Sequence, residues 1–384
     1  MNDSWIPANE AGRAKAMDQA LVTTDELPTM LTRLDRRGRR SLRGFSLLEM
    51  LAASAVFLLL IGLVLKMTQA TADSWSSSTG KTEGFRDARA AFATITKAVS
   101  QATLNPYFDY ADAGGNFRDQ VSSASFTPTQ YIRRSDLQFI TGKSLVDAGV
   151  QNPVSHAIFF LAPLGYSLEA NYRNMDGFLN ACGFYVFYGE DPAMPARLSG
   201  AIPASRNRFR LMQFLQPTEN LSIYDVSVTG GSANWRNTKW FGSALARNSA
   251  PVSQLAENVV ALVIRPKASD ADEAKATATL APDYEYDSRD PASAESVNQL
   301  PPVVEIVMVV IDDTSAQRLG NETTPPNLGL NNLFQDASRL DADLSELEKN
   351  LGAINGNAAG NKIPLRYQIF RTEVALRSAK WSSQ

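Results

Sequence analysis

Glu49 is the one charged residue in the apolar stretch Phe45–Leu65, which reads FSLLEMLAASAVFLLLIGLVL. A charged side chain inside such a segment costs about 2.5–3.5 kcal/mol on insertion-based scales, and it usually marks a function that involves a partner. Phe45 and Glu49 are four residues apart, so in a helix they share one face. The position of Glu49 therefore indicates a carboxylate that needs a cation from another molecule.

The other residues that could do chemistry are few. The chain has one histidine, His156, and one cysteine, Cys182. A histidine-based triad or a multi-histidine metal site needs specific partners, and a disulfide within the chain needs two cysteines. We expect His156 to be structural, Cys182 to be a small buried apolar residue, and Trp235 and Trp240 to lie in the core of a β-rich domain. The sequence thus indicates no enzyme, no catalytic residue, no metal and no cofactor.

The apolar stretch has the length of a membrane span. Its 21 residues form a helix of about 31 Å, against a hydrocarbon core of about 30 Å. Six arginines within Arg33–Arg43 precede it, and the positive-inside rule keeps such a cluster in the cytoplasm. Residues 45–384 hold 29 basic and 34 acidic residues, which argues against a nucleic-acid partner. We expect a single-pass inner-membrane protein with a periplasmic C-terminal domain.

Two simpler classes compete for the same stretch. An ordinary secretory signal peptide would be cut after the apolar core, near Ala72 in the sequence TADS. A plain membrane anchor would stay uncut. Neither explains Glu49, because the carboxylate adds a cost to both without a gain.

The sequence around Gly44 resembles the leader of type IV prepilins, which is found in pilins and in the pseudopilins of type II secretion. The basic cluster, Gly44, Phe45, the glutamate at the fifth position after the glycine and the uninterrupted apolar helix occur together. The resemblance implies that prepilin peptidase cuts between Gly44 and Phe45, and that Phe45 is then N-methylated. The Phe45 amine of one subunit would pair with the Glu49 carboxylate of its neighbour and set the stagger between subunits.

The sequence departs from the family in two ways. The leader of residues 1–44 is long, and Met17 and Met30 are alternative starts within it. Lys66 stands near the exit of the apolar helix, where many major pilins carry a proline. This second departure favours a pseudopilin or a minor pilin.

The N-terminal helix is expected to continue beyond the membrane span. We predict a transmembrane helix over residues 45–66 and an amphipathic continuation over residues 67–104, with weak helix formers at Ser74–Gly84. Asn105-Pro106 is expected to end the helix. The apolar stripe predicted to pack on the domain's own sheet consists of Phe85, Phe92, Ile95 and Val99.

Residues 105–384 read as an extracytoplasmic, β-rich domain. We predict an α+β fold in which the long N-terminal helix packs on a mostly antiparallel β-sheet. Val303–Ile311 is predicted to be a strand buried mostly on one face, and Leu333–Leu351 an amphipathic helix. The other expected strands are Leu137–Ile140, Ala157–Leu161, Phe184–Tyr188, Phe209–Leu215, Leu221–Val228, Val259–Ile264 and Tyr367–Leu376.

An acidic segment lies between Pro266 and Pro302. Alternating acids can supply oxygen ligands for calcium, but the glycine that an EF-hand loop requires is absent. We favour a solvated acidic loop and leave calcium binding open. The acids concerned, within residues 283–290, are Asp283, Glu285, Asp287 and Asp290.

Longer segments carry a wider resemblance. They include HAIFFLAPLGY (His156–Tyr166), LNACGFYVFYGED (Leu179–Asp191), NQLPPVVEIVMVVIDDTSAQRL (Asn298–Leu319) and FRTEVALRSAKW (Phe370–Trp381). Over most of the mature chain the sequence resembles the prepilin-like Verru_Chthon cassette protein C family. Its order of features is similar to the large J-like minor pseudopilins of type II secretion. The resemblance implies co-encoded prepilin-like partner subunits.

These features together predict a structural subunit. We expect a minor pilin-like or pseudopilin-like component of a type II secretion or type IV pilus-like apparatus. Its partners would be prepilin peptidase, the inner membrane and other prepilin-like subunits bound through the N-terminal helix. The alternative is a membrane-anchored extracytoplasmic binding protein or hydrolase that uses the prepilin pathway for export.

Overall fold

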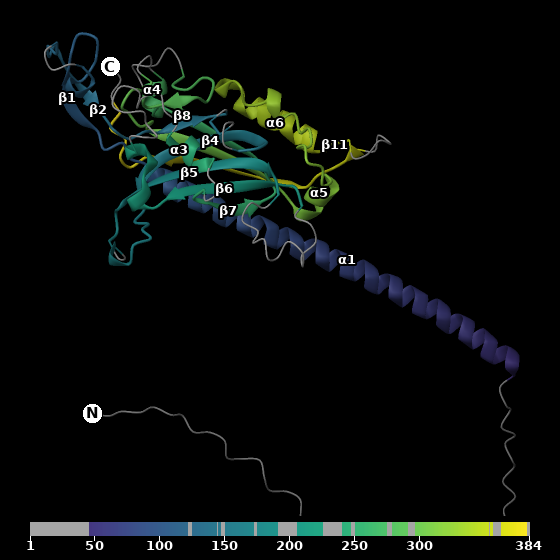
Figure 1. Cartoon of the computed structure of the whole chain (residues 1–384). Coiled ribbons are helices and arrows are strands. Elements are labelled where there is room, and N and C mark those ends of the chain that lie inside the picture. The colour runs from purple at the N-terminus through teal and green to yellow at the C-terminus, as the bar shows by residue number, and fades with distance from the viewer. Residues whose placement is uncertain are drawn as a thin grey trace, which may run out of the picture. The chain divides into compact units, whose positions relative to one another are not determined.

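The chain divides into two compact units, Met1–Met67 and Thr68–Gln384. Ser46 is the first residue that the structure describes. Figure 1 labels the elements. The computed structural model describes residues 46–121, 125–143, 145–146, 150–172, 175–190, 206–225, 240–246, 250–274, 279–290, 296–352, 354–355 and 362–381.

Helix α1 (Leu47–Ser100) has 54 residues and continues through the weak helix formers at Ser74–Gly84. It ends before Asn105-Pro106, so the predicted end is wrong. Ala102 and Leu104 are both buried. The helix ends in a turn at Gln101 and Ala102, whose N–H groups donate to the carbonyl oxygens of Ala98 and Val99, so Pro106 lies beyond a helix that has already ended.

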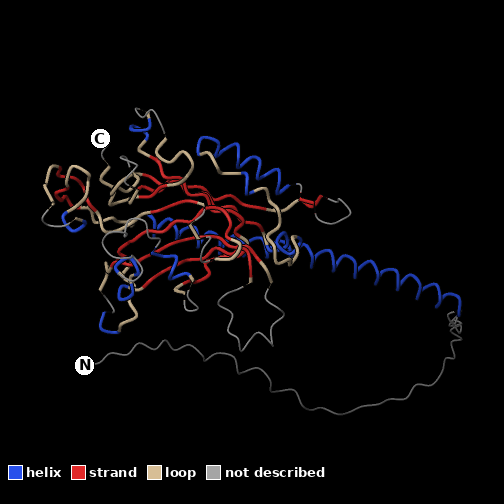
Figure 2. Tube along the Cα trace, turned by 45° about the horizontal axis from the view of Figure 1, so that its top comes forward, coloured by secondary structure: helices blue, strands red, loops and turns tan. Residues whose placement is uncertain are grey.

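The larger sheet has six strands in the order β7-β6-β5-β4-β3-β9, and every neighbouring pair is antiparallel. Its central strands are rich in aromatic and β-branched residues, which suit a pleated surface. Figure 2 shows the strands in red. Their bounds are β3 (Ile140–Gly142), β4 (Pro153–Pro163), β5 (Leu179–Gly189), β6 (Arg208–Gln216), β7 (Val252–Glu257) and β9 (Tyr286–Asp287).

A second sheet has three antiparallel strands in the order β13-β10-β8. They are β8 (Val259–Lys267), β10 (Val303–Ile311) and β13 (Tyr367–Ala375). With an N-terminal apolar helix and mostly antiparallel sheets, the chain has the expected α+β character.

Strand β10 is buried on both faces, and the prediction of one buried face is wrong. Ile306 and Met308 face a core shared with the six-stranded sheet. Val307 and Val309 face a second core built with helix α6 (Leu340–Gly352). Figure 1 shows α6 along one side of the strands. The second face of β10 is buried because α6 covers it.

Helix α6 confirms the amphipathic pattern but begins later than predicted. Residues Ala337–Arg339 form a single 3-10 turn, and the Asp336 side chain accepts a hydrogen bond from the Ser338 N–H. The local cap therefore delays the α-helix. Its buried leucines are Leu340, Leu344, Leu347 and Leu351.

The predicted strand at Leu221–Val228 is wrong over its described part. Ser222–Tyr224 forms a 3-10 turn. The Ser222 N–H donates to the side-chain Oε1 of Gln216 at 3.1 Å, and this contact curls the chain back onto the end of β6. Near Leu137–Ile140, the strand starts only at Ile140.

Several short elements were not predicted. Strands β1 (Tyr107–Ala111) and β2 (Gln130–Arg134) form a separate two-stranded ribbon. Strands β11 (Ile354–Asn355) and β12 (Lys362–Ile363) form another. The short helices are α3 (Trp240–Leu245), α4 (Asp270–Glu273) and α5 (Asp313–Arg318).

The second half of α1 contributes to the larger core. Ile95 and Val99 are fully buried, while Phe85 and Phe92 are partly buried against the same cluster. The ring centroid of Phe92 lies 5.6 Å from that of Phe370 in β13. These four side chains are the apolar stripe predicted for this part of the helix.

Trp240 lies in the same core, as expected for an aromatic residue of a β-rich domain. It is fully buried, and its indole N–H donates to the Oε1 of Gln138 at 2.9 Å. Trp235 lies outside the described residues.

Candidate functional site in the N-terminal helix

Ser46 caps the start of α1. The Glu49 N–H lies 3.2 Å from the Ser46 Oγ and 3.0 Å from the Ser46 carbonyl oxygen. The Met50 N–H donates to the same carbonyl at 3.2 Å. A serine that accepts from the third helical N–H is a typical N-cap. Ser46 therefore fixes the first turn in which Glu49 lies.

The Glu49 side chain is exposed in that first turn. A carboxylate near a helix N-terminus is stabilised by the helix dipole. Within the described part of the chain, the Glu49 carboxylate has no hydrogen-bond or ion-pair partner. The predicted cleavage and methylation positions, Gly44 and Phe45, lie outside the described residues.

Glu49 belongs to a helical segment that is long and apolar enough to cross a membrane. The segment is Leu47–Thr71, with 25 residues. At roughly 1.5 Å per residue it spans about 37 Å, which exceeds a hydrocarbon core of about 30 Å. Its large side chains are exposed; Leu47, for example, is 84% accessible. The segment needs an apolar environment and fits a single-pass anchor.

His156 is a structural residue of the buried core. Its Nδ1 accepts a hydrogen bond from the Ile264 N–H at 3.2 Å. Its Nε2 lies 3.3 Å from the carbonyl oxygen of Phe334, so this nitrogen carries the proton. Burial lowers the pKa of His156 to about 4, and the nearby charge of Lys143 acts in the same direction. Neither ring nitrogen is left for catalysis.

Cys182 is fully buried in β5. Burial raises the pKa of its thiol to about 12. A thiol that stays protonated and out of solvent is a poor nucleophile. Its place in the structure is that of a small apolar side chain.

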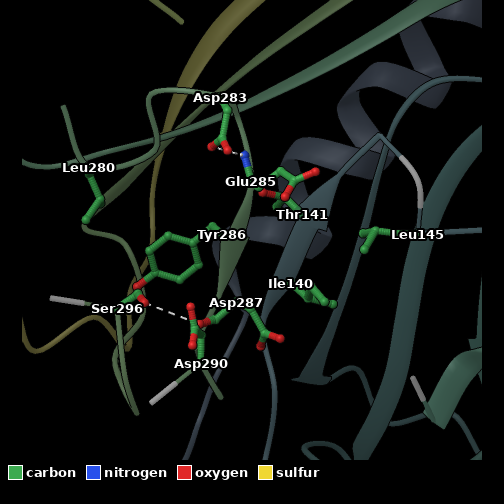
Figure 3. Close-up of a pocket in the computed structure, with 10 residues that line it drawn as sticks. All are labelled: Ile140, Thr141, Leu145, Leu280, Asp283, Glu285, Tyr286, Asp287, Asp290 and Ser296. Atoms are coloured by element: carbon green, nitrogen blue, oxygen red, sulfur yellow. Dashed lines mark hydrogen bonds between the residues drawn. The ribbon is translucent and has the colours of Figure 1, made fainter. Parts of the chain in front are cut away.

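The acidic residues near β9 line a cavity of about 390 Å³ (Figure 3). Asp287 Oδ1 accepts from the Gln138 side chain at 2.8 Å and from the Arg289 N–H at 2.9 Å. Asp283 Oδ1 accepts from the Glu285 N–H at 3.1 Å. Burial raises the pKa of Asp287 despite these hydrogen bonds.

These contacts bear on the calcium question. Among the residues that the structure describes, no group of three or more potential ligands could hold a metal ion. Oxygens of Asp283 and Asp287 already accept hydrogen bonds from the protein. Within the described residues, these acids form part of the polar lining of the cavity.

Ser46 is the residue of this site that the sequence analysis did not single out. A detectable signal was present, because a serine three residues before a glutamate has the spacing of a capping box. The capping role of Ser46 was missed because this serine stands inside a run of large hydrophobic residues, which indicates a membrane span.

Comparison with known proteins adds no family to this description. No family model, no curated protein and no solved structure matches the chain.

Proposed function

We propose that this chain is a minor pilin-like or pseudopilin-like structural subunit of a type II secretion or type IV pilus-like apparatus. The observation that carries the proposal is the Glu49 carboxylate, which stands without a described partner in the first turn of a membrane-length helix. An anchor gains nothing from that charge, whereas a subunit gains a directional contact.

The contact would form between two subunits. Prepilin peptidase cuts after Gly44 and creates an amine at Phe45, which is then methylated. The Glu49 carboxylate forms an ion pair with this amine of a neighbouring subunit, so that neither charge stays unpaired in lipid. Ser46 supports the pairing by fixing the first turn of α1.

The rest of the molecule fits the same role. The arginine cluster at Arg33–Arg43 holds the leader in the cytoplasm, and the domain after the span lies in the periplasm. The second half of α1 packs on the sheet, which is supported by the burial of Ile95 and Val99 and by the contact of Phe92 with Phe370. The subunit acts by assembly, without a reaction or a nucleic-acid partner.

The test compares the wild type with three variants of the full-length protein in membranes that contain prepilin peptidase. Glu49→Leu removes the carboxylate. The double variant Leu48→Glu/Glu49→Leu keeps the composition but turns the carboxylate by roughly 100° around the helix. We expect both variants to insert and to be cut after Gly44, and both to lose crosslinks between membrane-embedded prepilin subunits. Gly44→Val should stay uncut, because a β-branched residue obstructs the scissile backbone.

Two outcomes would overturn the proposal. Wild-type crosslinking in both Glu49 variants would leave the carboxylate without a role in assembly. A mature N-terminus near Ala72 would instead support ordinary signal peptidase. The first result would favour an anchored binding protein or hydrolase. The second would favour a protein that is released without the apolar helix.

A further inference from the structure

The ribbon of β1 and β2 has two different faces. Its register pairs Phe108 with Arg133 and Tyr110 with Tyr131. Because side chains alternate along a strand, these four residues share one face. We call this set, Phe108, Tyr110, Tyr131 and Arg133, the aromatic face of the ribbon. Figure 1 shows the ribbon at one end of the domain.

The opposite face holds the ribbon in place. Arg134 Nη1 donates to Asp119 at 2.8 Å and to Asp109 at 3.2 Å. Its guanidinium also lies 4.6 Å from the ring centroid of Phe117, which is fully buried. A buried arginine with two carboxylate partners fixes the strands. The aromatic face is therefore the one turned to solvent.

The three rings of the aromatic face form a continuous row. The centroids of Phe108 and Tyr131 are 5.6 Å apart, and those of Tyr110 and Tyr131 are 5.0 Å apart. The Arg133 guanidinium lies 6.0 Å from the Phe108 centroid. The exposed fractions are 56% for Phe108, 55% for Tyr110 and 62% for Tyr131. Exposed apolar groups that lie side by side usually mark an interaction site.

The size of the row favours a narrow ligand. With roughly 150–250 Å² for each aromatic side chain, three half-exposed rings offer about 350 Å². A stable protein interface buries about 800 Å² on each partner. The row is too small to hold a folded protein by itself. It matches a single polymer chain that lies along the ribbon.

The charge and the shape of the ribbon select among polymers. Residues 105–136 carry four acidic and three basic residues, so the surroundings do not attract a polyanion such as nucleic acid. Proline-rich peptides dock into grooves between aromatic rings. Here the rings of Tyr110 and Tyr131 touch, and no proline ring fits between them. A continuous row of rings remains, in which Phe108 and Tyr131 are inclined by 26° and Tyr110 and Tyr131 by 49°, and the two tyrosines carry phenol hydroxyls.

We propose that the aromatic face binds an uncharged polysaccharide chain built from gluco-configured sugars. When all hydroxyls of a pyranose are equatorial, both faces of the ring present C–H groups, which stack on aromatic rings. The hydroxyls at the edge of each sugar can hydrogen-bond the Tyr110 and Tyr131 phenol groups. This inference is independent of the proposed assembly role, because it uses no residue of the N-terminal helix.

The test measures retention of the purified full-length protein on insoluble polysaccharides. The detergent must have no sugar head group, since it would compete. The two probes are cellulose and chitin, which are uncharged, share the sugar configuration and differ in source. We expect retention of the wild type on at least one probe, with little change between 50 mM and 500 mM salt.

The variants separate stacking from general adhesion. Tyr131→Ala removes the central ring and should weaken binding at least tenfold, while Tyr131→Phe should stay within about threefold. Tyr166→Ala, at an exposed tyrosine outside the ribbon, should bind as the wild type does. An unchanged melting temperature shows that Tyr131→Ala is folded.

Three outcomes would overturn the proposal. These are no retention of the wild type on any probe, equal retention of Tyr131→Ala, and retention that disappears at high salt. Binding to single-stranded DNA in place of the sugars would assign the aromatic face to a different polymer.

Discussion

The ring of Phe92 lies 5.6 Å from the ring of Phe370, which brings the N-terminal helix into contact with the last strand of the chain. Ile95 and Val99, about one and two turns further along α1, are fully buried. Ile95 and Val99 thus belong to the larger core cluster, and Phe92 is partly buried against it.

This packing predicts how truncation and mutation affect stability. A fragment that begins at residue 67 should be soluble and folded, because the apolar span is removed and the stripe is kept. In that fragment, Ile95→Ala should lower the free energy of unfolding by about 2–5 kcal/mol. Thr94→Ala, on the exposed side of the same turn, should change it by less than about 0.5 kcal/mol. Urea unfolding followed by circular dichroism measures both.

A fragment that begins at residue 103 provides the stronger control. It lacks the whole stripe and should not give a cooperative transition. If it melts at the same temperature as the fragment from residue 67, the second half of α1 does not contribute to the core.

The burial of His156 predicts a pH dependence of stability. Its pKa falls from 6.5 to about 4 on folding, so between these values the unfolded chain binds more protons than the native one. The contribution of His156 to stability is fully present above pH 6.5 and is lost as the pH falls toward 4, by about 3 kcal/mol in total. Among the described residues, Lys143 acts on the charge of the ring and Tyr284 lies against it, with ring centroids 4.8 Å apart, while Asp343 acts on the charge of Lys143.

A variant isolates the histidine from the carboxylates that titrate in the same range. His156→Asn keeps a donor and an acceptor but does not titrate, so its stability should vary less between pH 7.5 and pH 4.5. The measurement is the urea midpoint of both proteins across that range. Parallel curves would mean that His156 is not the group responsible.

Gly183 allows close packing inside the six-stranded sheet. A Cβ at this position would meet the Phe159 Cδ1 at 2.2 Å and the Ile158 carbonyl oxygen at 3.0 Å. The Phe159 ring cannot move away easily, because it is stacked on Phe241 with centroids 3.8 Å apart. Gly183→Ala should therefore cost about 1–3 kcal/mol of stability or more.

The matched control is Gly352→Ala at the end of α6, where no atom beyond the adjoining residues and the helix's own backbone lies within 4 Å of the added Cβ. Its effect should stay within about 0.5 kcal/mol. Equal melting temperatures for the two variants would show that the sheet relaxes around Gly183 without loss.

Some features of this protein were determined by the sequence alone. The apolar run of α1, the place of Glu49 within it and the strand Val303–Ile311 depend on local composition and period. The leucine spacing of α6 is of the same kind. Such patterns are local, because the spacing of apolar residues within one segment is enough to predict a helix or a strand there. They predicted the α+β class and the candidate membrane span.

The remaining features were decided by contacts between distant residues. The Gln216 side chain turns Ser222 away from a strand, and α6 buries the second face of β10. His156 was expected to be structural, but its hydrogen-bond partners Ile264 and Phe334 lie more than 100 positions away and are known only from the fold. The spacing of residues within one segment cannot predict such contacts, because the stability of each contact depends on which distant side chains the fold brings together.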